Sequence, residues 1–167
     1  METRRTLLVD AFTDQPLAGN VAGVVPDAEG LRSEQMGRIA AELGASETAF
    51  VLDGKDDVDE RIRYFTPTAE IDLCGHATIA SYAALFAEGA IDAGDRTLRT
   101  NVGDLPITVE TDGTVWLRQS PPMVDIVDSS DASSIDTNSL DADRLGGALG
   151  IDPAALRDIG ADLPVAV

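Results

Sequence analysis

Short apolar or alternating segments in the first 120 residues predict a series of β-strands. Four of them are bounded by turn-forming residues such as glycine, proline and asparagine. They read RRTLLVDAF, VAGVV, ETAFVLD and RIRYFTP. Further along, the segment TLRTNVGDLPITVETDGTVWLRQ alternates around an Asp-Gly-Thr turn, which is typical of a hairpin. We therefore expect strands that pair mostly antiparallel.

Two other segments repeat their apolar residues at helical spacing. The first covers EQMGRIAAELG, with Ser33 as the predicted N-cap and Gly44 as the predicted stop. The second runs from about His76 to Glu88 and carries a wide apolar stripe rich in alanine. Small residues at this spacing suit a helix that a sheet encloses. The predicted fold class is therefore α+β, with mostly antiparallel strands around one central helix.

The character of the chain changes after residue 120. Residues 121–167 begin with an acidic, serine-rich stretch without clear periodicity, which predicts a linker. The stretch RLGGALGIDPAALRDIG then suits one or two short helices, and the chain stops at LPVAV, which resembles the approach to another strand. We expect one lobe at 1–120, followed at 121–167 by a linker and the start of a second, truncated lobe.

Charge and composition exclude several classes of protein. Thirty acidic residues against twelve basic ones give a net charge of −18, which argues against an electrostatic grip on nucleic acid. No run of about 18 apolar residues is available to span a membrane. The single cysteine cannot form an internal disulfide, which agrees with a reducing compartment. We expect a cytoplasmic protein that binds neither nucleic acid nor a membrane.

Cys74 and His76 are the only cysteine and the only histidine, and they stand just before the second predicted helix. A zinc site needs three or four ligands, and no second pair completes this one, so we expect no metal. As a catalytic thiol, Cys74 would have its thiolate favoured by the helix dipole. The alternative is a small buried residue at a strand-to-helix turn.

A third kind of site at this position uses the backbone. Gly75 is expected to let the chain turn tightly into the helix. The N–H groups from Gly75 to Thr78 have no partners within the helix, so they can hold a carboxylate or a phosphate. His76 can add a hydrogen bond or a proton. The alternative is an ordinary helix start that water or a capping side chain satisfies.

Glu47 is a candidate acid in the segment GASETAFV, between the first helix and an apolar strand. A carboxylate pressed against apolar neighbours is suited to taking and returning protons. The alternative is a solvated glutamate at the edge of a strand. The residues alone leave that choice open.

Three segments, GNVAGVV, SETAFV and RYFTPTAEIDLCGHATIA, resemble in order and spacing the N-terminal half of the phenazine-biosynthesis PhzF-like isomerases. That family is related in fold to diaminopimelate epimerase and proline racemase. The resemblance implies two similar lobes, each a curved, largely antiparallel sheet wrapped around a central helix, with the active site between them. It also implies that family members are longer than this chain.

The resemblance further implies proton transfer without a metal or an organic cofactor. Glu47 matches the glutamate that moves a proton between carbons of one substrate. Gly75 and His76 match residues that hold the substrate carboxylate, and Asn20 matches a residue that lines the cleft. Cys74 resembles one of the two catalytic thiols of the epimerase and racemase relatives. Val21 departs from the family, which usually has proline there.

These observations lead to a main hypothesis and two alternatives. The main hypothesis is a cofactor-independent isomerase that moves a proton on a small anionic carboxylic acid. The first alternative is an epimerase or racemase that depends on Cys74. The second is a folded half that only binds or assembles. A lone half exposes the inner face of its cleft, so we expect a homodimer or pairing with the missing lobe.

The surface charge also predicts the salt concentration that the protein requires. Lys55 is the only lysine, and aspartate outnumbers glutamate among the acids. Such a surface suits molar salt, where the Debye length falls to about 3 Å and self-repulsion is screened. We therefore expect a halophilic protein whose midpoint of urea unfolding rises as KCl is added. Full stability in dilute buffer would contradict this expectation.

Overall fold

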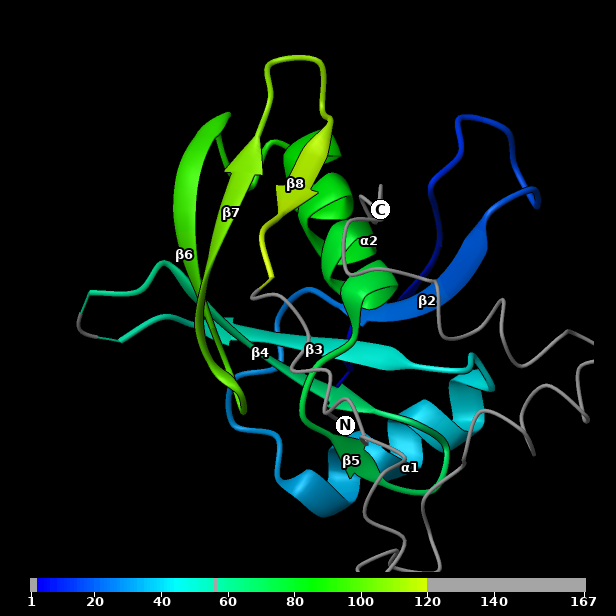
Figure 1. The fold of residues 1–167 in the computed structure, drawn as a ribbon. Coiled ribbons are helices and arrows are strands. Elements are labelled where there is room, and N and C mark those ends of the chain that lie inside the picture. The colour runs from blue at the N-terminus through cyan, green and yellow to red at the C-terminus, as the bar shows by residue number, and fades with distance from the viewer. Residues whose placement is uncertain (1–2, 56, 120–167) are drawn as a thin grey trace, which may run out of the picture. The chain divides into compact units, whose positions relative to one another are not determined.

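The structure is a computed structural model that describes residues 3–55 and 57–119 (Figure 1). The linker and the start of a second lobe that we predicted at 121–167 lie outside the described residues. Within the described part of the chain, neither helix has the length and apolar character needed to cross a membrane.

Eight strands and two helices make up the described part of the chain. The helices are α1 (Ser33–Leu43) and α2 (Gly75–Ala87). The strands are β1 (Leu7–Ala11), β2 (Asn20–Val25), β3 (Thr48–Asp53), β4 (Glu60–Phe65), β5 (Glu70–Ile71), β6 (Gly94–Thr100), β7 (Gly103–Val109) and β8 (Val115–Leu117). Each strand and helix predicted within the first 120 residues is present, and the two-residue β5 is the strand that the sequence pattern did not reveal.

The strands form one sheet that curls around α2 (Figure 1). Their order is β1-β2-β3-β4-β6-β7-β8, and β5 pairs with β4 beside this path. The pairs β2–β3 and β4–β6 are parallel, and the remaining pairs are antiparallel. Both parallel pairs enclose a helical crossover, because parallel neighbours cannot be joined by a tight turn.

The two faces of the sheet bury different clusters of side chains. On the inner face, alternate residues of the strands pack against α2, whose Ala77 and Ala80 allow close approach. On the outer face, α1 packs through Met36 against Phe50 and Phe65, whose rings meet edge to face with centroids 5.4 Å apart. The prediction of an α+β fold with mostly antiparallel strands around a central helix is confirmed.

The ends of α1 show where local sequence signals hold and where they fail. Gly44 ends the helix as predicted, because its backbone is left-handed with φ of 68°. The prediction of Ser33 as N-cap is wrong, since the cap is Arg32 and Ser33 is the first helical residue. The Arg32 N–H donates to the Gln35 side chain at 3.1 Å, while the Ser33 hydroxyl accepts a hydrogen bond from Arg63.

A buried carboxylate joins α2 to two strands of the inner face. Glu60 of β4 is 7% exposed, and the Tyr82 hydroxyl of α2 donates to its Oε2 at 2.8 Å. Arg96 of β6 donates through Nε to its Oε1 at 3.0 Å, and its Nη2 also contacts the carboxylate. Burial first, then the nearby carboxylate, raises the pKa of Tyr82, so its hydroxyl remains a donor.

Replacement of Arg96 tests how much this network contributes to the free energy of unfolding. Arg96→Gln leaves the buried Glu60 charge without its cationic partner, so we expect a loss of about 3 kcal/mol in the free energy of unfolding. The matched control is Arg38→Gln, because Arg38 is 78% exposed and pairs with Glu34 on the surface. That control is expected to cost about 0.5 kcal/mol or less. Urea unfolding measures both variants, and equal losses would contradict the prediction.

Candidate active site

Glu47 stands directly before β3 at the point where β2 and β3 begin to pair. Its carbonyl oxygen accepts the N–H of Gly23 at 2.9 Å, and Gly23 pairs with Thr48. A Cβ on residue 23 would lie 2.5 Å from the Thr48 hydroxyl, so glycine is needed for this close approach. The glycine of GNVAGVV thus fixes the backbone beside Glu47.

Hydrogen bonds of two buried hydroxyl groups fix the first turn of α2. The Thr78 hydroxyl donates to the Cys74 carbonyl at 2.7 Å. The Tyr64 hydroxyl lies 2.6 Å from the same threonine oxygen, which it can therefore reach as a donor. Cys74 is the N-cap in an extended conformation, and no side chain caps the helix by a hydrogen bond. This start of α2 is therefore fixed in position but lacks a side-chain cap.

Gly75 is the first residue of α2, and its role differs from the predicted one. Its backbone is not among those with positive φ, so the expected tight turn does not require glycine there. A Cβ at this position would meet only the Gln119 side chain, at 3.6 Å. A substrate-binding role for Gly75 stays a prediction. Gln119 follows β8, and the local sequence offered no signal that it reaches this turn.

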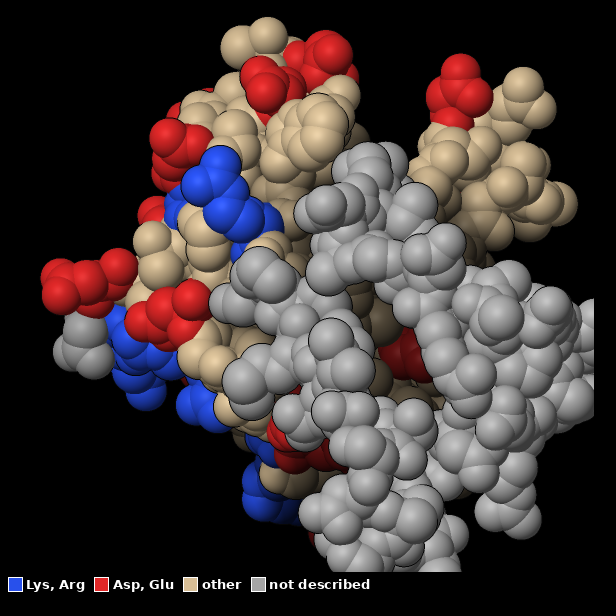
Figure 2. All heavy atoms as spheres, in the orientation of Figure 1, with Lys and Arg blue, Asp and Glu red and all other residues tan. Residues whose placement is uncertain are grey.

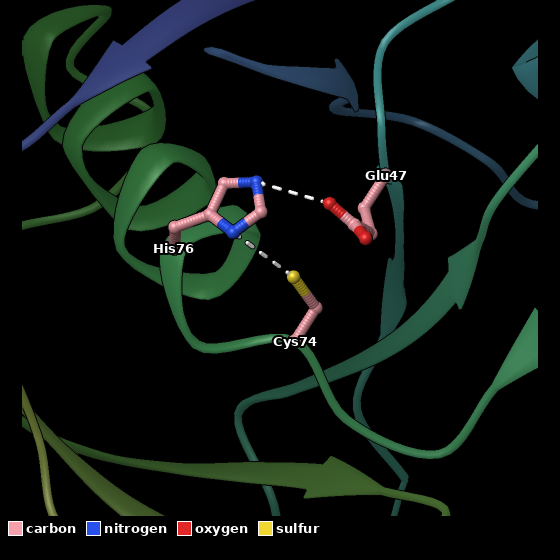
Figure 3. A group of neighbouring side chains, drawn as sticks. All are labelled: Glu47, Cys74 and His76. Carbon is pink, nitrogen blue, oxygen red and sulfur yellow. Dashed lines mark hydrogen bonds and ion pairs between the residues drawn. The ribbon is translucent and has the colours of Figure 1, made fainter. Parts of the chain in front are cut away.

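His76 lies between Cys74 and Glu47 (Figure 3). Its Nδ1 is 3.3 Å from Cys74 Sγ, and its Nε2 is 3.4 Å from Glu47 Oε2. The His76 and Glu47 side chains are 12% and 24% exposed. Nε2 is buried and makes no hydrogen bond with the described residues. Three of the five predicted site residues therefore form one cluster, and Gly75 adjoins it in the chain.

Burial decides the protonation state of the thiol in this cluster. It raises the pKa of Cys74, and the charge of Glu47 raises it further, while the backbone N–H groups of Ala77 and His76 only oppose this. The net shift is upward, contrary to the expected stabilisation of a thiolate by the helix dipole. A thiol can donate to Nδ1, and a neutral His76 ring then carries its proton on Nε2, towards Glu47.

The cluster also bears on metal binding. Glu47, Cys74 and His76 offer oxygen, sulfur and nitrogen atoms within 4.8 Å of one another, a donor set that zinc accepts. Sequence reasoning did not associate Glu47 with the other two. However, Cys74 and Glu47 approach opposite nitrogens of the ring (Figure 3). One ion bound to one ring nitrogen is poorly placed for both, so this arrangement suits proton transfer better than metal ligation.

The Asn20 side chain makes no hydrogen bond with Glu47, Cys74 or His76. Asn20 is the first residue of β2, is exposed, and pairs with Ala11 of β1. Its amide makes no hydrogen bond within residues 3–55 and 57–119. Asn20 lies three residues before Gly23, on the strand that supports Glu47. Its predicted place in the lining of a cleft stays a prediction.

Comparison with known proteins identifies the family. The family model for PhzC-PhzF, phenazine biosynthesis-like protein, matches residues 9–160. Trans-2,3-dihydro-3-hydroxyanthranilate isomerase of Pseudomonas aeruginosa is 40% identical over 106 residues, covering 64% of this chain and 37% of that protein. This relative and seven other curated ones that match are all named as isomerases, and the chain spans between 25% and 43% of the length of these eight.

Solved structures give the same result. A PhzF-family phenazine biosynthesis protein of Bacillus anthracis is 43% identical with a TM-score of 0.64, covering 70% of this chain and 40% of that one. A hydroxyproline epimerase from Agrobacterium vitis shares the fold, with a TM-score of 0.51 at 17% identity over 69% of this chain and 42% of that one. This chain belongs to the PhzC-PhzF family of phenazine biosynthesis-like proteins.

Proposed function

We propose that this chain supplies the acid–base half of a cofactor-independent isomerase that moves a proton on a small carboxylic acid. The observation that carries the proposal is the alignment of Glu47, at the start of β3, with His76 Nε2 at the open first turn of α2, 3.4 Å apart. Glu47 is the general base and acid. His76 and the backbone N–H groups of the first turn hold the anionic end of the substrate.

The substrate class follows from charge and from a relative. The uncapped first turn of α2 favours a carboxylate, because helix N-termini carry a partial positive charge. The Pseudomonas aeruginosa relative is named for a hydroxylated cyclic amino acid that bears such a group. We infer a ligand of the same class for this chain, with its carboxylate at α2 and the reacting carbon beside Glu47.

The reaction requires no change of oxidation state. The Glu47 carboxylate takes a proton from a carbon next to an electron-withdrawing group and returns it to another carbon of the same molecule. His76 supports this step if Nε2–H donates a hydrogen bond to the substrate or to Glu47. A cleft lined from one side cannot exclude water, so we propose that a second lobe or a second copy of the chain completes it.

The alternative in which Cys74 is the base has less physical support. A base must be deprotonated at working pH, and burial raises the pKa of this thiol. In our proposal Cys74 is a positioning residue that keeps the proton of His76 on Nε2. The other alternative is a fragment that only binds or assembles. It predicts no proton exchange, whereas both catalytic hypotheses predict exchange.

Solvent isotope exchange tests the role of Glu47. In D2O the chain is expected to incorporate deuterium at one carbon of trans-2,3-dihydro-3-hydroxyanthranilate, followed by NMR. Glu47→Gln removes the base and is expected to slow incorporation by about a hundredfold or more. The control is Glu42→Gln, because Glu42 is an exposed glutamate of α1. Unchanged exchange in Glu47→Gln would end the proposal that Glu47 is the base, and no exchange in the wild type would show that this chain alone does not isomerise this compound.

A second prediction concerns the thiol. Because its pKa is raised, Cys74 is expected to react with iodoacetamide more slowly than free cysteine at pH 8, with the rate still rising at higher pH. Cys74→Ser retains a hydroxyl that can donate to His76, so exchange is expected to fall by less than about tenfold. A loss as large as that of Glu47→Gln would favour the cysteine-dependent epimerase.

A further inference from the structure

A pocket lies on the outer face of the sheet, away from Glu47. It is bounded by the last residues of β3, the middle of β4 and the end of β6, and it has a volume of about 280 Å³. Leu31 and Leu52 give it an apolar wall, and Lys55, Arg61, Arg63 and Arg99 give it a cationic one. This volume is close to the lower end of small-molecule sites, about 300 Å³.

Among the described residues, the charge of this pocket is opposite to that of the chain. Four basic side chains and two acidic ones, Glu29 and Asp53, line it there, whereas acids outnumber bases thirty to twelve in the whole sequence. Figure 2 shows basic side chains gathered beside the turn between β3 and β4, on a surface where acids are otherwise frequent. A protein of net charge −18 thus concentrates cations at one pocket.

Strand pairing brings two of these cations side by side. Arg61 of β4 and Arg99 of β6 are direct partners in the parallel pair. Their neighbours Glu60 and Leu98 are buried on the inner face, so both arginines belong to the outer face. Like charges at such positions destabilise a sheet. Asp104 offsets the charge of Arg99, whereas an anion bound at Arg61 would offset that of Arg61.

Two of the four cations are bonded to carboxylates of the protein, and the other two are free to bind a ligand. Arg63 donates to Glu70 and to the Ser33 hydroxyl, and Arg99 donates to Asp104. Among the described residues, Arg61 and Lys55 form no ion pair.

The two acids of the pocket do not neutralise these available cations. The Glu29 carboxylate accepts the backbone N–H of Asp53 at 3.1 Å. Neither Glu29 nor Asp53 forms an ion pair with Arg61 or Lys55 in the part of the chain that the structure describes. Within the described residues, Arg61 and Lys55 therefore have no ion-pair partner at close range, and Arg61 interacts with the Glu70 carboxylate only at longer range.

We propose that this pocket binds a small organic anion. A phosphate or carboxylate head lies between Arg61 and Lys55, and a short apolar part rests against Leu31 and Leu52. Guanidinium groups suit both heads because they donate two parallel hydrogen bonds. The apolar wall distinguishes such a ligand from an inorganic ion. The pocket lies on the opposite face of β3 and β4 from the Glu47 cluster, so this site is independent of the proposed function.

Calorimetric titration of the full chain tests the site at one fixed KCl concentration. The probes are phenyl phosphate, benzoate, inorganic phosphate and the neutral benzyl alcohol. We expect at least one aromatic anion to bind more tightly than inorganic phosphate, and benzyl alcohol not to bind. Arg61→Gln and Lys55→Gln are each expected to weaken binding by about tenfold, the effect of one lost charged hydrogen bond.

The matched control is Arg38→Gln, which removes one exposed positive charge outside the pocket and is expected to bind as the wild type does. Circular dichroism confirms that each variant is folded, and Arg61→Lys, which keeps the charge, is expected to retain part of the affinity. The proposal is overturned if neither aromatic anion binds or if inorganic phosphate binds equally well. An equal loss of binding in Arg38→Gln would overturn it too, since it would indicate attraction by charge alone.

Discussion

Enclosure of α2 by the curled sheet is the constraint on which the rest of this structure depends. A helix that strands surround must present small residues on several sides, and Ala77, Ala80 and Ser81 are buried for this reason. Its first turn, by contrast, begins at Cys74 without a side-chain hydrogen bond that caps the helix. Packing therefore fixes the axis of the helix, and the fixed axis determines what its N-terminus can hold.

Polar groups inside the apolar enclosure fix the helix along its own direction. Tyr82 is anchored to Glu60, and Thr78 contacts Tyr64, so both anchors connect α2 to β4. Apolar contacts alone would tolerate a small slide or rotation, whereas directional hydrogen bonds do not. The distance between His76 and Glu47 is set by these anchors, because one residue belongs to α2 and the other precedes the strand that pairs with β4.

Local patterns predicted the strands and helices because periodicity and turn residues act over a few neighbouring positions. They could not predict the Glu60–Arg96 pair, whose members are far apart in sequence, nor the correct cap of α1, where Arg63 takes up the Ser33 hydroxyl. At the site, sequence blocks indicated Glu47 and His76 but not their contact. The shift in the thiol's pKa was missed because desolvation depends on the folded surroundings of Cys74.

The parallel pairing of β4 with β6 has a consequence for the order of assembly. Glu60 pairs with Leu98, and the intervening chain includes the whole of α2. During synthesis the apolar inner surface of β1–β4 emerges from the ribosome before α2, the helix that covers it. The nascent chain, more than the finished protein, is the stage at which aggregation competes with folding.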